Sequence, residues 1–408
     1  MRRPFEESRE IGGADPIDVG IVARRQPLRA LLSGLLRRRG ALGLAPAIAP
    51  AVVFVPLGVV LGPAFLGLLS RNVLVHLDVV VSVGLAALGV FVGTALKLPS
   101  ARDRALLVAG CIESFITIGF VAAALWFLLV QWGMPLLLPP ALVALTLGIC
   151  AAASSAGSVE SSSDEKHRTA TRIADLDDAL PILIGGVAIA LVASTGAAPV
   201  KDALMSAGRT ALAGLAIAVA GWLLFERAHS NTERGVFIVG TLVLLGGSAA
   251  SLSGSPLLAG MAAGLFWTWM PGRAEQMVRE SLRKFQHPLI VLMLLVAGAS
   301  CRLTMAAIWL FAPLVLFRLA GKLAGGWVAA RLREEVTPGD LGTYLIAPGL
   351  LGIAFALNVH QMGGAVGGTD IITATSAAAL ASEALAIVLV PTKSERPDAP
   401  IRTETTPA

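Results

Sequence analysis

Long apolar segments separated by short polar ones run from residue 44 to residue 391 of the chain. A membrane-spanning helix needs about 20 mostly apolar residues, and this pattern predicts an all-α polytopic membrane protein. The weakest of its spans are the first, which carries three prolines, and the eighth, which is short. About twelve spans are predicted, at residues 44–62, 73–96, 105–131, 136–157, 173–194, 203–225, 235–251, 254–270, 286–301, 304–330, 340–361 and 370–391.

Composition supports this interpretation and excludes two classes of protein. Of the 408 residues, 55% are apolar and 14% are charged, whereas soluble domains carry about 25% charged residues. A water-soluble globular enzyme is therefore excluded. The 32 Lys and Arg residues are too dispersed among apolar sequence to indicate nucleic-acid binding. The five His and three Cys residues show no metal-ligand or disulfide pattern, so we expect no cofactor.

Alternating the spans across the bilayer separates the basic residues by side. With the N-terminus in the cytoplasm, the outer side keeps only Arg71, Lys201, Arg209 and Arg302. This asymmetry follows the positive-inside rule. We therefore expect a multi-pass protein of the plasma (inner) membrane with both termini cytoplasmic. Its parts would be a basic tail at 1–43, a transmembrane domain at 44–392 and a short tail at 393–408.

A few ionisable residues remain inside the predicted spans. Such residues cost several kcal/mol in a bilayer unless they face a cavity or a partner, so a functional role is the default interpretation. At 1.5 Å per residue, they lie roughly 9–12 Å from the cytoplasmic side, in one layer. The alternative is that they form ion pairs that only hold helices together, and it applies especially to Glu113 and Glu383. The main members of the layer are Glu113, Asp178, Lys322 and Glu383, with Asp177 and Arg318 beside them.

Asp177 and Asp178 are adjacent carboxylates on one predicted span. Neighbouring side chains on a helix point about 100° apart, so the two cannot share one partner equally. One can pair with a basic residue while the other lines a cavity. Burial favours the uncharged forms of carboxylic acids and amines. These groups can then exchange protons near neutral pH, as coupled binding of an ion and a proton requires.

Two predicted spans contain interruptions. The fourth ends in residues 151–157, which include Ser154 and Ser155, and the eleventh is interrupted at Ala347, Pro348 and Gly349. Each is the middle span of a trio, and the two trios have opposite orientations. Interrupted helices at matching positions of inverted halves indicate the substrate site of a transporter. The glycine-rich stretch 363–368 lacks the context of a phosphate-binding loop and predicts an outer loop.

Several segments carry a resemblance to a known family. Residues 56–63 (PLGVVLGP) and 89–96 (GVFVGTAL) are similar to the first two glycine-rich helices of the cation:proton antiporter superfamily. More specific is the combination of 174–178 (ADLDD) with 318–322 (RLAGK). Together they resemble the paired-aspartate, sodium/hydrogen exchanger-like branch of that superfamily.

The resemblance implies an inverted-repeat sodium–proton antiporter fold with two crossed broken helices. Helices at 105–194 and 304–391 would form a core domain, and those at 44–96 and 203–301 a dimerisation domain. The partners would be a monovalent cation, protons, the lipid bilayer and a second copy of the chain. Exchange would follow an elevator-like movement of the core.

The resemblance also implies roles for single residues. Asp178 would bind the transported cation, for which sodium is expected, or a proton, and Asp177 would pair with Lys322. Ser154 and Ser155 fall where the family's unwound helix supplies polar groups. Some members carry an acid where Ser155 stands, which leaves the choice of cation open. Possible accessory residues are Glu113, Arg318, Pro348, Gly349 and Glu383.

Two other functions fit parts of the sequence. Sodium-coupled symporters of organic solutes share this kind of fold, but they usually bind sodium through neutral groups, unlike the set of Asp177, Asp178 and Lys322. Intramembrane prenyltransferases use two aspartate clusters on loops, whereas this chain has one cluster inside a span. Cation:proton exchange is therefore the expected function, with solute symport as the alternative.

Overall fold

A computed structural model describes residues 50–389 apart from 99, 134–135, 156–164, 195–197, 271–273, 334–336, 338–339 and 363. The tails predicted at 1–43 and 393–408 lie outside the described residues, as do residues 44–49 and 390–391 at the ends of the first and last predicted spans.

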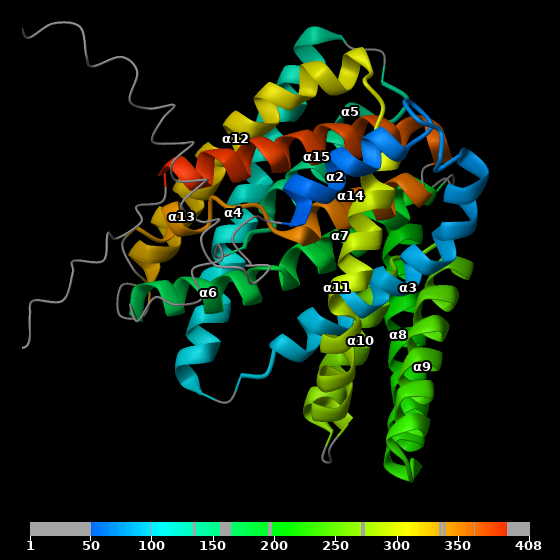
Figure 1. Cartoon of the computed structure of the whole chain (residues 1–408). Coiled ribbons are helices and arrows are strands. Elements are labelled where there is room, and N and C mark those ends of the chain that lie inside the picture. The colour runs from blue at the N-terminus through cyan, green and yellow to red at the C-terminus, as the bar shows by residue number, and fades with distance from the viewer. Residues whose placement is uncertain are drawn as a thin grey trace, which may run out of the picture. The chain divides into compact units, whose positions relative to one another are not determined.

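The described residues fold into α-helices joined by short connections (Figure 1). Ser and Thr side chains accept hydrogen bonds from the first turns of several of them, and Ser100 with Asp103 forms a capping box at the start of α4. In chain order the helices are α2 (Pro50–Leu61), α3 (Arg71–Ala95), α4 (Ala101–Trp132), α5 (Pro140–Ala152), α6 (Glu165–Asp177), α7 (Ala179–Ala193), α8 (Pro199–Arg227), α9 (Asn231–Ser251), α10 (Pro256–Trp269), α11 (Ala274–Ser300), α12 (Met305–Leu332), α13 (Leu341–Tyr344), α14 (Leu350–Met362) and α15 (Gly364–Leu389).

Each predicted span coincides with one helix or with two consecutive ones, which confirms the all-α polytopic fold. The fifth span corresponds to α6 and α7, and the eleventh to α13 and α14. Among the residues that the structure describes, seven helical segments are long and apolar enough to cross a membrane, and α2, α5 and α14 are shorter apolar helices. Phe115, Phe127 and Leu212 are each more than 60% exposed. Such exposure of large apolar side chains is expected where the surroundings are lipid.

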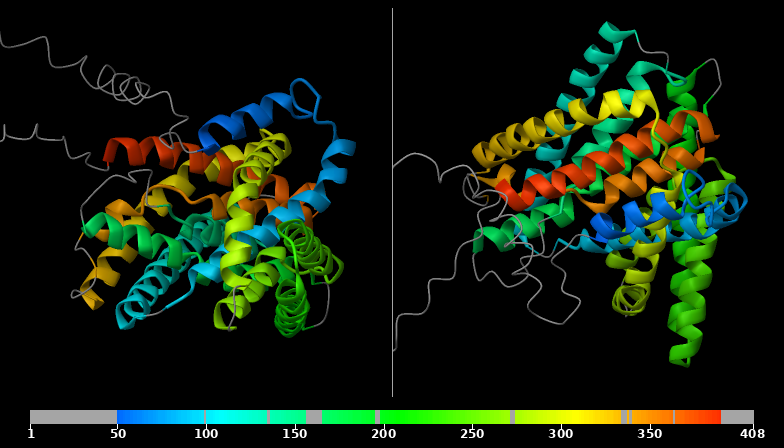
Figure 2. Two further views of the ribbon diagram at one scale, coloured as in Figure 1. Left: turned by 60° about the horizontal axis from the view of Figure 1, so that its bottom comes forward. Right: turned by 45° about the horizontal axis from the view of Figure 1, so that its top comes forward.

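The helices pack in two sets within this part of the chain (Figure 2). In one set, α4 lies against α5 and α12, and α15 lies against α12 and α14. In the other, α10 lies against α3 and α8, α9 lies against α8, and α11 lies against α2. Helices of the two predicted trios thus contact one another, while α7 lies against both α5 and α8 and so joins the two sets.

Glycines allow the close approach of α3 and α10. A Cβ atom at Gly89 or Gly93 would collide with backbone oxygens of α10, and one at Gly260 or Gly264 would collide with those of α3. Each pair is separated by three residues, which is the spacing that lets membrane helices pack backbone to backbone. The glycine-rich stretch 89–96 therefore serves helix packing.

The prediction of an outer loop at 363–368 is wrong for most of that stretch. Helix α15 begins at Gly364. A Cβ atom at Gly368 would collide with the backbone of His360, and one at Gly367 would lie 3.0 Å from Leu138. These two glycines are needed because α15 packs closely against α14 and its neighbours, so their composition does not signal a loop.

Candidate functional site

The two interrupted helices meet at their breaks. Helix α5 ends at Ala152, and the chain that follows pairs with the extended segment before α14. Ser154 and Pro348 form an antiparallel β-bridge. The amide of Ser155 donates to the carbonyl oxygen of Ala347 at 3.0 Å, and the amide of Gly349 donates to that of Ala153 at 3.2 Å. The interruptions predicted from sequence therefore cross each other.

Two predicted accessory residues shape this crossing. A Cβ atom at Gly349 would lie 2.7 Å from the carbonyl oxygen of Ser154, so the close approach requires glycine. The Ser155 hydroxyl donates to the carbonyl oxygen of Pro348 at 3.1 Å. Ser155, Pro348 and Gly349 thus belong to one backbone junction.

Arg318 of α12 ties the crossing together. Its guanidinium donates to the carbonyl oxygen of Ile346 at 2.6 Å, to that of Ala153 at 3.0 Å and to that of Ala347 at 3.4 Å. The residue is 3% exposed. Breaking a helix leaves carbonyl groups without helical partners. The planar guanidinium has several donors and binds carbonyl groups of both interrupted segments.

Lys322, one turn further along α12, joins three other elements. Its ammonium lies 3.0 Å from Glu113 Oε2 on α4 and 3.6 Å from Asp177 Oδ2 on α6. It also donates to the carbonyl oxygen of Ala152 at the end of α5. The side chains of Lys322, Glu113 and Asp177 are all 0% exposed. The predicted partner Asp177 is thus present, together with a second carboxylate that is closer.

Asp177 and Asp178 sit where helical hydrogen bonding is interrupted between α6 and α7. Pro181 has no amide hydrogen, so the carbonyl oxygen of Asp177, four residues earlier, lacks its helical donor. The hydroxyl of Ser114 on α4 donates to that oxygen instead, at 3.0 Å. The carbonyl oxygen that loses its helical donor at this break therefore accepts a hydrogen bond from a hydroxyl of the neighbouring helix.

The two aspartates have different surroundings. Asp177 is buried, and its Oδ2 accepts a hydrogen bond from the Ser154 hydroxyl. Asp178 is half-buried, and its Oδ1, like Oδ1 of Asp177, is buried without a hydrogen-bond partner among the described residues. The two carboxylates therefore differ in that Asp177 is held through Oδ2 by Lys322 and Ser154.

Two hydroxyl groups of the site were not predicted from the sequence. Thr117 donates to Glu113 Oε1 at 2.8 Å, and Ser114 binds the backbone of Asp177 as described above. Thr117 lies four residues after Glu113, so both point to one face of α4, which is a signal that the sequence contained.

Glu383 lies on α15 and is close enough to Arg318 to interact with it electrostatically.

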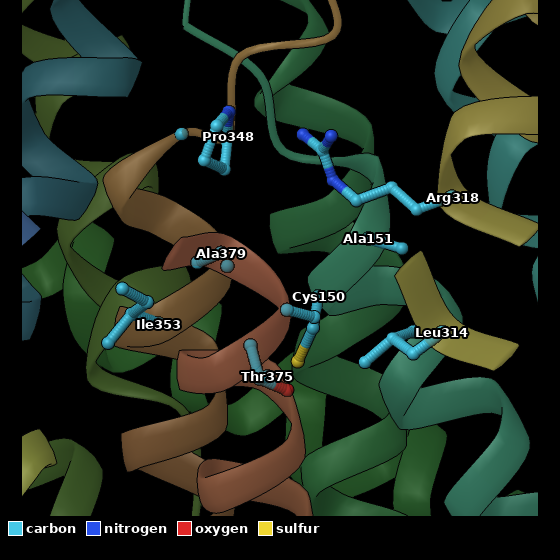
Figure 3. Close-up of a pocket in the computed structure, with 11 residues that line it drawn as sticks. Cys150, Ala151, Leu314, Arg318, Pro348, Ile353, Thr375 and Ala379 are labelled. Atoms are coloured by element: carbon cyan, nitrogen blue, oxygen red, sulfur yellow. The ribbon is translucent and has the colours of Figure 1, made fainter. Parts of the chain in front are cut away.

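A small cavity lies beside the crossing (Figure 3). Residues of α5, α12, α14 and α15 line it, among them Cys150, Arg318 and Thr375. Its volume of about 20 Å³ suits one water molecule. The hydroxyl oxygen of Thr375 is buried and has no hydrogen-bond partner among the described residues, so the cavity has a polar wall.

Two crossed broken helices, each in the middle of an inverted trio, define the fold of a sodium–proton antiporter. No family model and no curated protein matches the chain. Among solved structures, the chain is similar to the sodium proton antiporter MjNhaP1 from Methanocaldococcus jannaschii, determined at pH 8. The TM-score is 0.60 at 17% sequence identity, over 88% of this chain and 94% of that one. This likeness confirms the predicted fold.

Proposed function

We propose that this protein exchanges a monovalent cation, sodium in the first instance, for protons across the membrane. The observation that carries the proposal is the unequal environment of two adjacent aspartates at the crossing. Asp177 is fully buried and bound by Lys322 and Ser154, whereas Asp178 is only half-buried, with an Oδ1 that has no hydrogen-bond donor among the described residues. The fold, which is shared with a sodium proton antiporter, supports the same function.

The proposed mechanism is competition at Asp178. Ionised Asp178 binds the cation together with oxygens of the interrupted helices, including those near Ser154 and Ser155. Protonation of Asp178 removes the negative charge and releases the cation. An empty ionised carboxylate is costly to move through the membrane interior, so the core crosses with a cation or a proton but not without either. This restriction couples the two fluxes.

We further propose that α4–α7 and α12–α15 form the moving core and that the remaining helices form a dimerisation domain. The packing of the helices in two sets supports this division. The active form would then be a homodimer in the plasma (inner) membrane with both termini cytoplasmic, as the distribution of Lys and Arg predicts.

Asp178→Asn tests the proposed exchange. In everted vesicles, we expect the variant to lose cation-driven dequenching of a proton-gradient dye, at least about tenfold, because asparagine neither ionises nor takes up a proton. The measurement is dequenching across a panel of sodium, potassium and lithium, with and without a membrane-potential clamp.

Asp202→Asn is the matched control, since Asp202 is exposed at the start of α8. It should keep wild-type exchange. Undiminished dequenching in Asp178→Asn would refute the mechanism. Sodium-driven uptake of an organic solute without proton movement would favour the symporter instead.

A further inference from the structure

The last turns of α14 make two polar contacts with the other set of helices. The Gln361 side chain donates to the carbonyl oxygen of Asp78 on α3 at 3.1 Å and to its carboxylate oxygen Oδ1 at 3.2 Å. The Asn358 side chain donates to the Ser255 hydroxyl at the start of α10 at 2.9 Å. In the topology predicted from the sequence, these four residues lie at the outer ends of their spans.

Apolar packing lies between these contacts and the paired aspartates. Phe355, Asn358 and Gln361 follow one another at intervals of three residues, so they share one face of α14. A Cβ atom at Gly185 of α7 would lie 2.4 Å from the Phe355 ring. Leu257 of α10 lies beside Phe355, and the two side chains are 1% and 2% exposed. The predicted outer side is therefore closed first by apolar packing and then by the two hydrogen bonds.

The predicted cytoplasmic side of the aspartates is more open. Asp178 is half-buried, and Asp175, about one turn away toward the cytoplasmic end of α6, is exposed. This difference between the two sides is that of a conformation in which the site faces the cytoplasm. A conformation that faces outward requires α14 to separate from α3 and α10.

We propose that Gln361 with Asp78, and Asn358 with Ser255, form an outer gate that holds the core in the conformation facing the cytoplasm. Both hydrogen bonds join α14, in the proposed core, to helices of the proposed dimerisation domain, so both break when the site opens outward. The four side chains are positioning residues, which set the ratio of the two conformations. This inference rests on the exchange activity and the core movement proposed above.

Such a gate determines the apparent affinity for the cation on each side. The apparent dissociation constant is the intrinsic one divided by the fraction of protein in the binding-competent conformation. The half-saturating sodium concentration outside, divided by that in the cytoplasm, therefore follows the ratio of cytoplasm-facing to outward-facing protein. Loss of one hydrogen bond changes a ratio of this kind about fivefold.

The test compares half-saturating sodium concentrations in right-side-out and everted vesicles, at equal pH on both sides and zero membrane potential. Gln361→Leu removes the donor and should lower the outer-to-cytoplasmic ratio about fivefold. Gln361→Lys places an ammonium beside the Asp78 carboxylate and should raise the ratio, because a charge-assisted contact is stronger than a neutral donor's. A merely structural role of Gln361 would not give shifts of opposite sign.

Two kinds of control accompany these variants. Asp78→Asn keeps an acceptor oxygen, so it should keep the wild-type ratio alone and cancel the rise in Gln361→Lys. Gln131 is exposed near the end of α4, and Gln131→Leu and Gln131→Lys should both keep the wild-type ratio. An unchanged ratio in Gln361→Leu, or shifts of the same sign in both Gln361 variants, would overturn the gate and leave the exchange activity established.

Thiol labelling at position 257 tests the gate without transport. In a background free of the three native cysteines, Leu257→Cys should react with an impermeant maleimide from outside only when the gate opens, because a buried thiol is inert. Gln361→Leu should speed this labelling about fivefold and Gln361→Lys should slow it. Equal labelling rates would overturn the gate even in inactive variants. These rate changes in a protein without cation-driven proton flux would refute the exchange function and support the gate.

Discussion

Carbonyl groups at interrupted helices need donors inside the membrane, and the Arg318 guanidinium donates to three of them, of which those of Ala153 and Ala347 also accept from backbone amides. Its guanidinium donates to the carbonyl oxygen of Ala153 in one interrupted segment and to those of Ile346 and Ala347 in the other. A buried acceptor that loses its donor costs about 1–3 kcal/mol. At the residue scale, the crossing therefore depends on one side chain that binds no transported ion itself.

Arg318→Met should destabilise the protein by about 1–3 kcal/mol, since the carbonyl oxygen of Ile346 loses its donor while those of Ala153 and Ala347 keep the amides of Gly349 and Ser155. The unfolding midpoint in detergent would fall by several degrees, and exchange would fall with it. Arg209→Met, on the exposed surface of α8, is the control and should change little. An unchanged midpoint in Arg318→Met would show that other donors replace the guanidinium.

Single residues were predicted unequally well from the sequence. An ionisable residue in an apolar span is costly, so the positions of Asp177, Lys322 and Arg318 within such spans were enough to single them out. The distance from Lys322 to Glu113 depends on how closely α4 approaches α12, which the sequence does not state. Ser114 and Thr117 are common residue types in membrane helices, so their role could be recognised only from their contacts.

At the scale of elements, the break between α6 and α7 places the paired aspartates. Pro181 frees the carbonyl oxygen of Asp177, and Ser114 binds it. The sequence predicted one continuous span at 173–194, because membrane helices tolerate a single proline such as Pro181 in an apolar pattern. The interruptions at 151–157 and 347–349 were recognisable because small residues, Pro and Gly gather there.

Pro181→Ala tests whether this break matters for exchange. Alanine restores the amide donor to the carbonyl of Asp177, so we expect a more regular helix, a displaced Asp178 and exchange lowered about tenfold. The unfolding midpoint should stay near that of the wild type or rise. The measurement pairs vesicle exchange with thermal unfolding.

Pro288→Ala removes another proline from inside a helix, on the exposed side of α11, and should leave exchange intact. Wild-type exchange in Pro181→Ala would mean that the position of Asp178 does not depend on the break.

At the scale of the molecule, several polar contacts join the two sets of helices within the described part of the chain, and one of them links two buried side chains. Asn358 of α14 donates to the Ser255 hydroxyl at the start of α10, at 2.9 Å, and both side chains are buried. A core that moves past α10 has to break this hydrogen bond. The contact therefore reports whether the proposed movement occurs.

Ser255→Cys and Asn358→Cys can be joined by a short cleavable thiol reagent in a background free of Cys111, Cys150 and Cys301. The cross-link should reduce exchange at least about tenfold. Cleavage of the reagent should restore it. A cross-link between positions 97 and 275, which pair Lys97 with Glu275 at 2.6 Å, stays within one set and is the control. Full exchange in the cross-linked 255–358 protein would contradict movement of the core past α10.

The contacts of Arg318 have a thermodynamic consequence for transport. They bind both interrupted segments to α12, so in the proposed movement of the core the oxygens around the aspartates would travel as one unit with fixed mutual distances. A unit that carries its ligands unchanged gives the cation the same intrinsic dissociation constant from either side of the membrane. Any difference in affinity between the two sides then originates in the access paths and in the membrane potential, outside the coordination sphere.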